Sequence, residues 1–352
     1  MSHPADPAAV ASWMRAHGIT VAGDLRADLI AGGRSNLTYR LTDSSGATWV
    51  LRRPPTGHVL ATAHDMSREW RFISAFATTH VPVPAPIALC EDDAIVGAPF
   101  YLMGLVDGIV LSDHAATTHL EEDARAALSI DLVDVLAELH DVDVDAAGIG
   151  TIGPRDDYLA RQLRRWDKQW QATYEQAGLR DLPMAQLHAT LSQTAPPQSR
   201  VSVVHGDYRL GNVLTSRSGS VEAVVDWELA ALGDPLADVG WMLAGWLEPG
   251  EARGPVGVPE SPTDVPGFAR REALAARYAE LTGTDVAELD YYIAFAHWRM
   301  ACILAGVTAR YQAGVMGDDG TDVPAFRDAV QEWLERTTAA ALHLLAAGCA
   351  TS

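Results

Sequence analysis

The chain has 352 residues, 26 basic against 46 acidic side chains, a formal net charge of −20 and 48% hydrophobic residues. Such an acidic surface argues against nucleic-acid or anionic-membrane partners, and no run of about 18 apolar residues predicts a membrane span. The three scattered cysteines, Cys90, Cys302 and Cys349, form no CxxC pair, and the first 18 residues lack a basic region followed by an apolar run. These features predict a reduced, cytoplasmic protein.

The first third of the chain alternates short apolar runs with turns. Its expected helices span 6–18 and 66–76, and its expected strands span 28–31, 37–42, 48–53, 87–90 and 99–106. Asp107-Gly108 is a turn signal, so we place a boundary there between an N-terminal nucleotide-binding lobe, 1–106, and a catalytic and substrate-binding lobe, 107–352. The N-terminal lobe is predicted to be a small α+β unit with five strands.

After residue 107 the hydrophobic pattern becomes helical. The expected helices cover 121–141, 158–176, 183–194, 235–247, 268–282, 285–312 and 324–347. A Pro- and Gly-rich segment, 249–267, is long for a loop in a compact domain, which suggests a lid over a pocket or a mobile connection.

Two polar segments carry the residues best suited to chemistry. The first, 203–214, places Asp207 and Asn212 in a turn between apolar pairs. The second begins with Asp226, on which the strand-like run 221–225 ends. A carboxylate can orient an attacking hydroxyl, while an Asn oxygen and a second carboxylate suit Mg²⁺. We therefore predict Asp207 as the catalytic residue, and Asn212 and Asp226 as metal ligands, in phosphoryl transfer from Mg-ATP. Asp and Asn in glycine-containing loops also serve as plain turn formers.

Several neighbours of these segments are given supporting roles. His205 is expected to orient the loop by hydrogen bonding rather than to transfer protons, and Asp238 to brace the loop from below. Two roles remain open for Glu228: it is either a supporting group behind the metal or a solvated side chain. Trp241 and Trp246 are the tryptophans that border the loop.

A glycine-rich turn and a cation–carboxylate pair lie upstream. Arg52 is expected to pair with Glu69 and to bind the α- and β-phosphates, although Arg53 could take the same part. The turn between the first two strands could bring backbone amides to phosphate oxygens, but a plain hairpin turn is the simpler interpretation of this stretch alone. Its residues are Gly32, Gly33, Arg34, Ser35 and Asn36.

Together these residues resemble the aminoglycoside phosphotransferase and choline kinase-like family. The resemblance implies a protein kinase-like two-lobed fold, with a small five-stranded antiparallel sheet lobe and a larger, mostly helical C-terminal lobe. It also implies that Met103, Gly104 and Val106 form the hinge that binds adenine. Arg52 stands where the family usually has a lysine, a departure that matters because the two side chains bind phosphate differently.

Two further segments, 139–150 and 158–166, resemble the branch of this family that is fused to acyl-CoA dehydrogenases. We therefore expect an ATP- and Mg²⁺-dependent enzyme that phosphorylates a small hydroxylated metabolite, such as a hydroxyacyl-CoA or hydroxy acid, and acts as a monomer or homodimer. An aminoglycoside or another antibiotic is the alternative acceptor, since an acidic protein suits a polycation. A nucleotide-binding module without catalysis is the third hypothesis.

Overall fold

The computed structural model describes residues 5–31, 36–55, 65–180, 182–255, 258, 260–316 and 320–351. Its N-terminal part is a five-stranded antiparallel sheet in the order β1-β2-β3-β5-β4. The strands are β1 Leu25–Ala31, β2 Leu37–Asp43, β3 Thr48–Arg53, β4 Pro86–Cys90 and β5 Phe100–Met103. The five predicted strands are confirmed, although the fifth ends at Met103 because Gly104 donates its amide hydrogen to Ala85 outside the sheet (2.8 Å).

Helices cover both faces of this sheet, as the alternation of side chains along a strand requires. Helix α1, Pro7–Ala16, packs with Leu51 and Leu102 in one apolar cluster, while α2, Met66–Phe76, packs with Val50 and Tyr101 in the other. Asp65 caps α2, accepting the amide of Arg68 at 3.0 Å. A four-residue helix, α3 Asp93–Val96, was not predicted.

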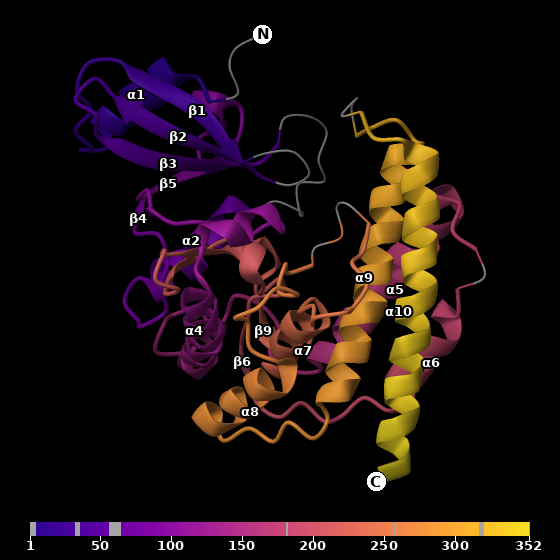
Figure 1. Ribbon diagram of the computed structural model, residues 1–352. Coiled ribbons are helices and arrows are strands. Elements are labelled where there is room, and N and C mark those ends of the chain that lie inside the picture. The colour runs from indigo at the N-terminus through magenta and orange to yellow at the C-terminus, as the bar shows by residue number, and fades with distance from the viewer. Residues whose placement is uncertain are drawn as a thin grey trace.

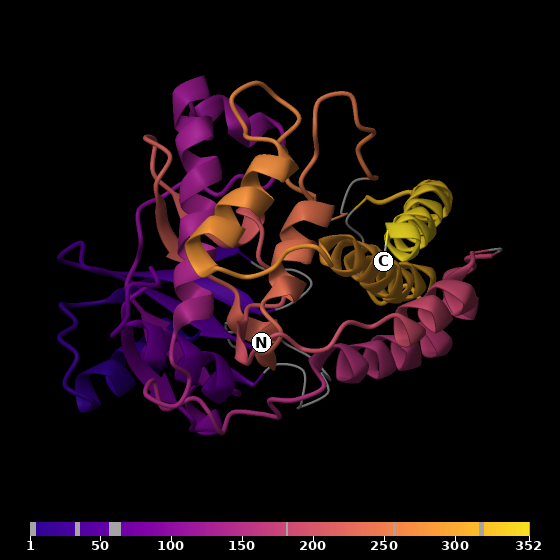
Figure 2. The same cartoon turned by 90° about the horizontal axis from the view of Figure 1, so that it is seen from below.

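The C-terminal part is mostly helical, and α5, α9 and α10 run side by side away from the sheet (Figures 1 and 2). Its helices are α4 Glu122–Asp141, α5 Tyr158–Ala177, α6 Met184–Gln193, α7 Leu236–Ala244, α8 Arg271–Thr282, α9 Leu289–Gln312 and α10 Val323–Thr351. The predicted α+β fold class, with a sheet lobe before a helical lobe, is confirmed; the boundary at residue 107 stays a prediction.

Helix α9 is the centre of the helical part. Within the described residues it is the one helix long and apolar enough to cross a membrane, but 83% of its apolar window is buried inside the protein. Contacts with α5, α7 and α10 explain this burial. Its apolar composition therefore reflects packing in the core.

Two short two-stranded sheets support the polar segments singled out in the sequence. Strands β6 Ser202–Val204 and β9 Ala231–Gly233 pair antiparallel, as do β7 Val213–Thr215 and β8 Val221–Val224. Short 3₁₀ turns span Ala115–His119, Leu210–Asn212 and Trp227–Leu229. The loop 205–212 thus leaves the end of β6 and enters β7, with both of its ends fixed in sheet.

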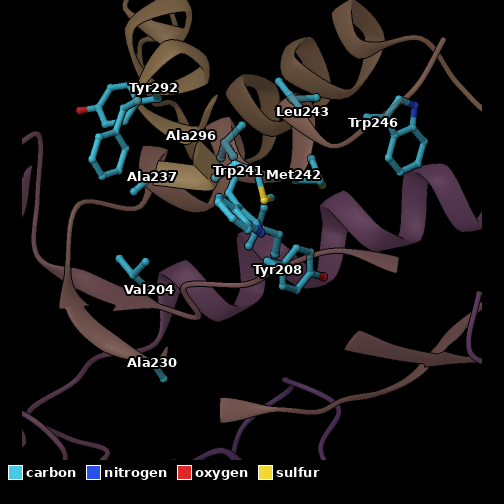
Figure 3. Close-up of a cluster of buried hydrophobic side chains, with 14 of the residues drawn as sticks. Val204, Tyr208, Ala230, Ala237, Trp241, Met242, Leu243, Trp246, Tyr292 and Ala296 are labelled. Carbon is cyan, nitrogen blue, oxygen red and sulfur yellow. The ribbon is translucent and has the colours of Figure 1, made fainter. Parts of the chain in front are cut away.

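Buried side chains form the floor beneath this loop (Figure 3). Val204, Tyr208 and Ala230 lie near Trp241 and Met242 of α7, and all five are at most 5% exposed. The Tyr208 hydroxyl donates to the carbonyl of Leu132 on α4 at 2.8 Å. The loop therefore rests on a packed core, which restricts the positions its polar side chains can take.

Candidate active site

The loop 205–212 is held from beneath by Asp238 of α7. The Asp238 carboxylate accepts the backbone amides of His205 (2.6 Å) and Gly206 (2.8 Å), and its side chain is 1% exposed. Arg299 of α9 donates to the carbonyl of Gly206 at 2.5 Å. Hydrogen bonds to a charged group are stronger than neutral ones, so the start of the loop is rigid. Asp238 therefore braces the loop from below, as predicted.

Glycine is required at position 206. Its φ is +83°, in the left-handed region that side chains with a Cβ avoid. An added Cβ would also lie 2.8 Å from the carbonyl oxygen of Leu229. The close approach of the 3₁₀ turn Trp227–Leu229 therefore depends on this residue, and so does the spacing between the two polar segments.

Asp207 projects from the loop with its carboxylate held on both sides. Oδ1 accepts the indole N–H of Trp241 (2.8 Å) and Oδ2 accepts the side-chain amide of Asn212 (2.7 Å). Arg209 Nε lies 3.3 Å from Oδ1. His205 receives the amide of Asp207 on Nδ1 (3.2 Å) and contacts the carbonyl of Val225 through Nε2 (3.0 Å), so it orients the loop as expected.

Asn212 and Asp226 line one cavity together. Because the Asn212 amide nitrogen donates to Asp207, the amide oxygen is left for another partner. Asp226 has a φ of +69°, a conformation that costs about 1–3 kcal/mol for a non-glycine residue and is typical of functional sites. No group of three His, Cys, Asp or Glu side chains within the described ranges could hold a metal by itself. A metal here would need its remaining oxygen ligands from phosphate and water.

Arg52 joins the sheet to the helical part. Its Nε donates to Glu69 Oε2 at 2.9 Å, and its Nη2 donates to Asp226. Burial opposes the charge of Arg52, but Glu69 and Asp226 raise the pKa of Arg52 above its ordinary range. Tyr101 donates to Glu69 at 3.0 Å, which completes the surroundings of this carboxylate.

The strand register decides between Arg52 and Arg53. Arg52 stands opposite Thr38 on β2 and Tyr101 on β5, so it shares their face of the sheet, and all three line the cavity. Arg53 points to the other face, where Nη1 donates to the carbonyl of Val96 at 2.9 Å. Only Arg52 faces the polar segments.

Glu228, which the sequence left open, belongs to the same charged group. Its Oε2 lies 3.4 Å from the side-chain nitrogen of Asn36, whose nitrogen also donates to Glu69 at 2.6 Å. Burial and the neighbouring Asp226 raise the pKa of Glu228 to about 8. The position two residues after Asp226, within a 3₁₀ turn, was the only sequence signal for this placement.

The cavity between the sheet and the helical part has a volume of about 310 Å³. Met103, Gly104 and Val106 line it as expected of a hinge, although the amide of Gly104 is already bonded to Ala85. Asn36 contacts Glu69 instead of lining the cavity, and Gly32, Gly33, Arg34 and Ser35 lie outside the described residues. The remaining walls are Ile30, Thr38, Val50, Arg52, Ile73, Pro84, Tyr101, Leu105, Val110, Gly211, Asn212, Leu214, Val225, Asp226 and Trp227.

This geometry, a sheet and a helical part enclosing a cavity lined by Asp226, Asn212 and Arg52, with Asp207 bonded to Asn212, is that of a kinase-like phosphotransferase. The model of the phosphotransferase enzyme family matches residues 26–292, and the chain belongs to this family. It is therefore an enzyme that transfers a phosphoryl group to an alcohol.

The relatives agree on the family. Acyl-CoA dehydrogenase family member 10 of Mus musculus is 36% identical over 80% of this chain, and member 11 of Gallus gallus is 32% identical over 83%. The chain spans only 26% and 38% of those two proteins. The oligomeric state and the compartment stay predictions.

Solved structures agree on the fold. A crystal structure from Ralstonia eutropha, provisionally described as an aminoglycoside phosphotransferase, is 32% identical with a TM-score of 0.76, covering 96% of this chain and 97% of its own. A more distant aminoglycoside phosphotransferase, solved with AMP-PNP and hygromycin B, is 18% identical with a TM-score of 0.57, covering 94% of this chain and 99% of its own. That second likeness shows the fold alone.

Proposed function

We propose that this enzyme transfers the γ-phosphoryl group of ATP, in the presence of Mg²⁺, to the hydroxyl group of a small metabolite. The observation that carries the proposal is that Asn212, Asp226 and Arg52 line one cavity together with Met103, Gly104 and Val106, while Asp207 is hydrogen bonded to Asn212. Positioning and charge neutralisation supply most of the rate in phosphoryl transfer, and these four side chains suit both tasks.

Each side chain has a part in this proposal. Asp207 accepts a hydrogen bond from the acceptor hydroxyl and orients it toward the γ-phosphate. Asn212 and Asp226 offer oxygen ligands, which fit a hard cation such as Mg²⁺. That ion, when bound, neutralises phosphate charge during transfer. Arg52 binds the α- and β-phosphates while Glu69 holds its guanidinium in place.

The pairing of Arg52 with Asp226 fits a site prepared for a metal nucleotide. Arg52 balances the charge of Asp226, the carboxylate that is proposed to bind the metal. Asp226 and Asn212 would hold the cation and Arg52 would bind phosphate oxygens. Glu69, 2.9 Å from Arg52 Nε, would hold the guanidinium in place.

For the acceptor we propose a hydroxyacyl thioester or hydroxy acid rather than an aminoglycoside. Arg209 and Trp241 contact Asp207, so a cation and an indole flank the proposed position of the acceptor hydroxyl. A polycationic antibiotic would be repelled by Arg209. The relatives named as acyl-CoA dehydrogenase family members favour an acyl compound.

Purified wild-type enzyme and an Asp207→Asn variant, assayed with Mg-ATP, test this proposal on hydroxy acids, hydroxyacyl thioesters and aminoglycosides. The proposal expects product from an acyl-type acceptor with the wild type, and turnover lowered at least a hundredfold in the variant with ATP affinity nearly unchanged. Resistance to aminoglycosides in a sensitive bacterium that expresses the chain would favour the antibiotic alternative. Equal turnover by the two proteins would refute the role of Asp207.

A further inference from the structure

A second pocket begins on the other side of Asp207. Trp241, which donates to Asp207 Oδ1 at 2.8 Å, and Arg209, whose Nε lies 3.3 Å from the same oxygen, both line it. None of its described walls lines the nucleotide cavity. The Asp207 carboxylate therefore stands between the two spaces, where a hydroxyl from one could meet a phosphate from the other.

Arg209 reaches toward both spaces. It lines the second pocket, yet its Nη1 occupies the place where a Cβ on Gly211 would lie, and Gly211 lines the nucleotide cavity. Its Nε is buried and has no hydrogen-bond partner in the described part of the chain. The loop therefore places one cation at the junction of the two spaces.

The walls of the second pocket are mainly apolar. They include Trp241 from α7, Met300 and Ala296 from α9, and Trp333 from α10. Glu260 also lines the pocket, but its carboxylate already accepts the amide of Gly254 (2.7 Å) and the indole N–H of Trp333 (3.1 Å).

His297 of α9 lines this pocket, and the proposed reaction gives its side chain no role. Among the described residues none forms a hydrogen bond with it. Burial, with a smaller contribution from the charge of Arg271, lowers the pKa of His297 to about 4, so its imidazole is neutral near pH 7. His297 is half-buried in the pocket wall, so its imidazole can hydrogen bond to a ligand oxygen that enters the pocket.

We propose that this pocket is the acceptor subsite and that His297 determines acceptor specificity by hydrogen bonding to a neutral oxygen beside a short apolar chain. The inference rests on the proposed function for the hydroxyl held at Asp207. The pocket has a volume of about 20 Å³, room for about one water or one carbonyl oxygen, so its walls must part to admit the chain that carries this oxygen. The acceptor class is a hydroxyacyl compound with an uncharged carbonyl oxygen.

A pair of acceptors that differ in one atom tests this assignment. The probes are a short-chain hydroxyacyl methyl thioester and the matching hydroxyalkyl methyl thioether, which lacks the carbonyl oxygen. Wild type should prefer the thioester, and His297→Leu should raise the KM of the thioester roughly tenfold while leaving that of the thioether unchanged; one neutral hydrogen bond has about this effect. His297→Gln should keep most of the preference, because an amide can hydrogen bond to the same oxygen.

Binding measurements separate a failure of this inference from a failure of the proposed function. Quenching of tryptophan fluorescence reports thioester binding beside Trp241 and Trp333 without turnover, and Mg-ATP binding checks that each variant is folded. His343→Leu, the same substitution at an exposed histidine of α10 that lines neither pocket, is the matched control and should keep the wild-type preference.

If wild type binds the thioester more tightly than His297→Leu does but transfers no phosphate, the subsite stands and the proposed reaction fails. If phosphate is transferred and His297→Leu keeps the wild-type preference for the thioester, the inference about His297 is wrong. The absence of thioester binding to folded wild-type protein would also overturn it.

Discussion

Arg52 is the residue whose replacement tests most closely how the sheet and the helical part are joined. Its side chain is 10% exposed and contacts two carboxylates, Glu69 at 2.9 Å and Asp226. A hydrogen bond to a charged group contributes about 1.5–3 kcal/mol, and removing one partner of a buried ion pair costs about 3–5 kcal/mol. Arg52→Lys should therefore lose about 1.5–3 kcal/mol of unfolding free energy, because one ammonium cannot reproduce the guanidinium fork.

Arg52→Ala leaves the buried Glu69 and the partly buried Asp226 uncompensated and should lose about 3–5 kcal/mol. Urea denaturation followed by tryptophan fluorescence measures these losses, and calorimetric titration measures the affinity for Mg-ATP. The affinity should fall in both variants, and further in the alanine variant. Arg53→Lys is the control, because Arg53 faces away from the cavity and should leave nucleotide affinity unchanged. Wild-type urea midpoint and ATP affinity in Arg52→Ala would refute this reasoning.

Three further predictions concern the loop and the second pocket. Asp238→Asn should lower the unfolding free energy by about 2–4 kcal/mol, because an amide cannot accept both loop N–H groups as a carboxylate does; an unchanged urea midpoint would contradict the brace. Gly206→Ala should lower kcat while Mg-ATP affinity persists, since φ is +83° and the new Cβ would meet the Leu229 carbonyl; wild-type kcat would count against it. The pKa of His297 is about 4 when folded and about 6.5 when unfolded, so the unfolded state binds more protons between these values. Stability should fall by up to about 3 kcal/mol as the pH drops through that window, and urea midpoints should show a smaller fall in His297→Gln.

The local features of the site could be predicted from the sequence. Asp207 and Asn212 are five positions apart in one turn, so their proximity follows from chain geometry, and Asp226 ends the next apolar run. The supporting part of His205 also followed from its position in this turn. These predictions needed no knowledge of distant contacts, unlike the brace from Asp238, which lies in α7.

The choice between Arg52 and Arg53 could not be made in the same way. Adjacent strand residues face opposite sides of a sheet, and which side meets the helical part depends on β3 lying between β2 and β5. Glu228 was left open for a related reason, because its surroundings come from Asn36, a residue distant in sequence. The tertiary structure was needed to choose between the two arginines and to place Glu228.

No pattern in the sequence predicted the second pocket. Its walls include residues 209, 241, 258, 260, 297 and 333, which pack together only when α7, α9 and α10 are in place. The suggestion that 249–267 covers a pocket agrees with the place of Val258 and Glu260 in these walls, and the acceptor role stays a proposal. A lone histidine on an apolar helix could not be singled out before its neighbours were known.

The central claim is that this chain phosphorylates a hydroxylated metabolite at the expense of ATP. Its most direct test incubates the protein with Mg-ATP and a metabolite extract and identifies by mass spectrometry the species that gain a phosphate. With wild-type protein we expect a hydroxyacyl compound or hydroxy acid to gain one phosphate, and no such product with Asp207→Asn. The same products from both proteins, or Mg-ATP binding with no phosphorylated metabolite from any extract, would contradict the claim.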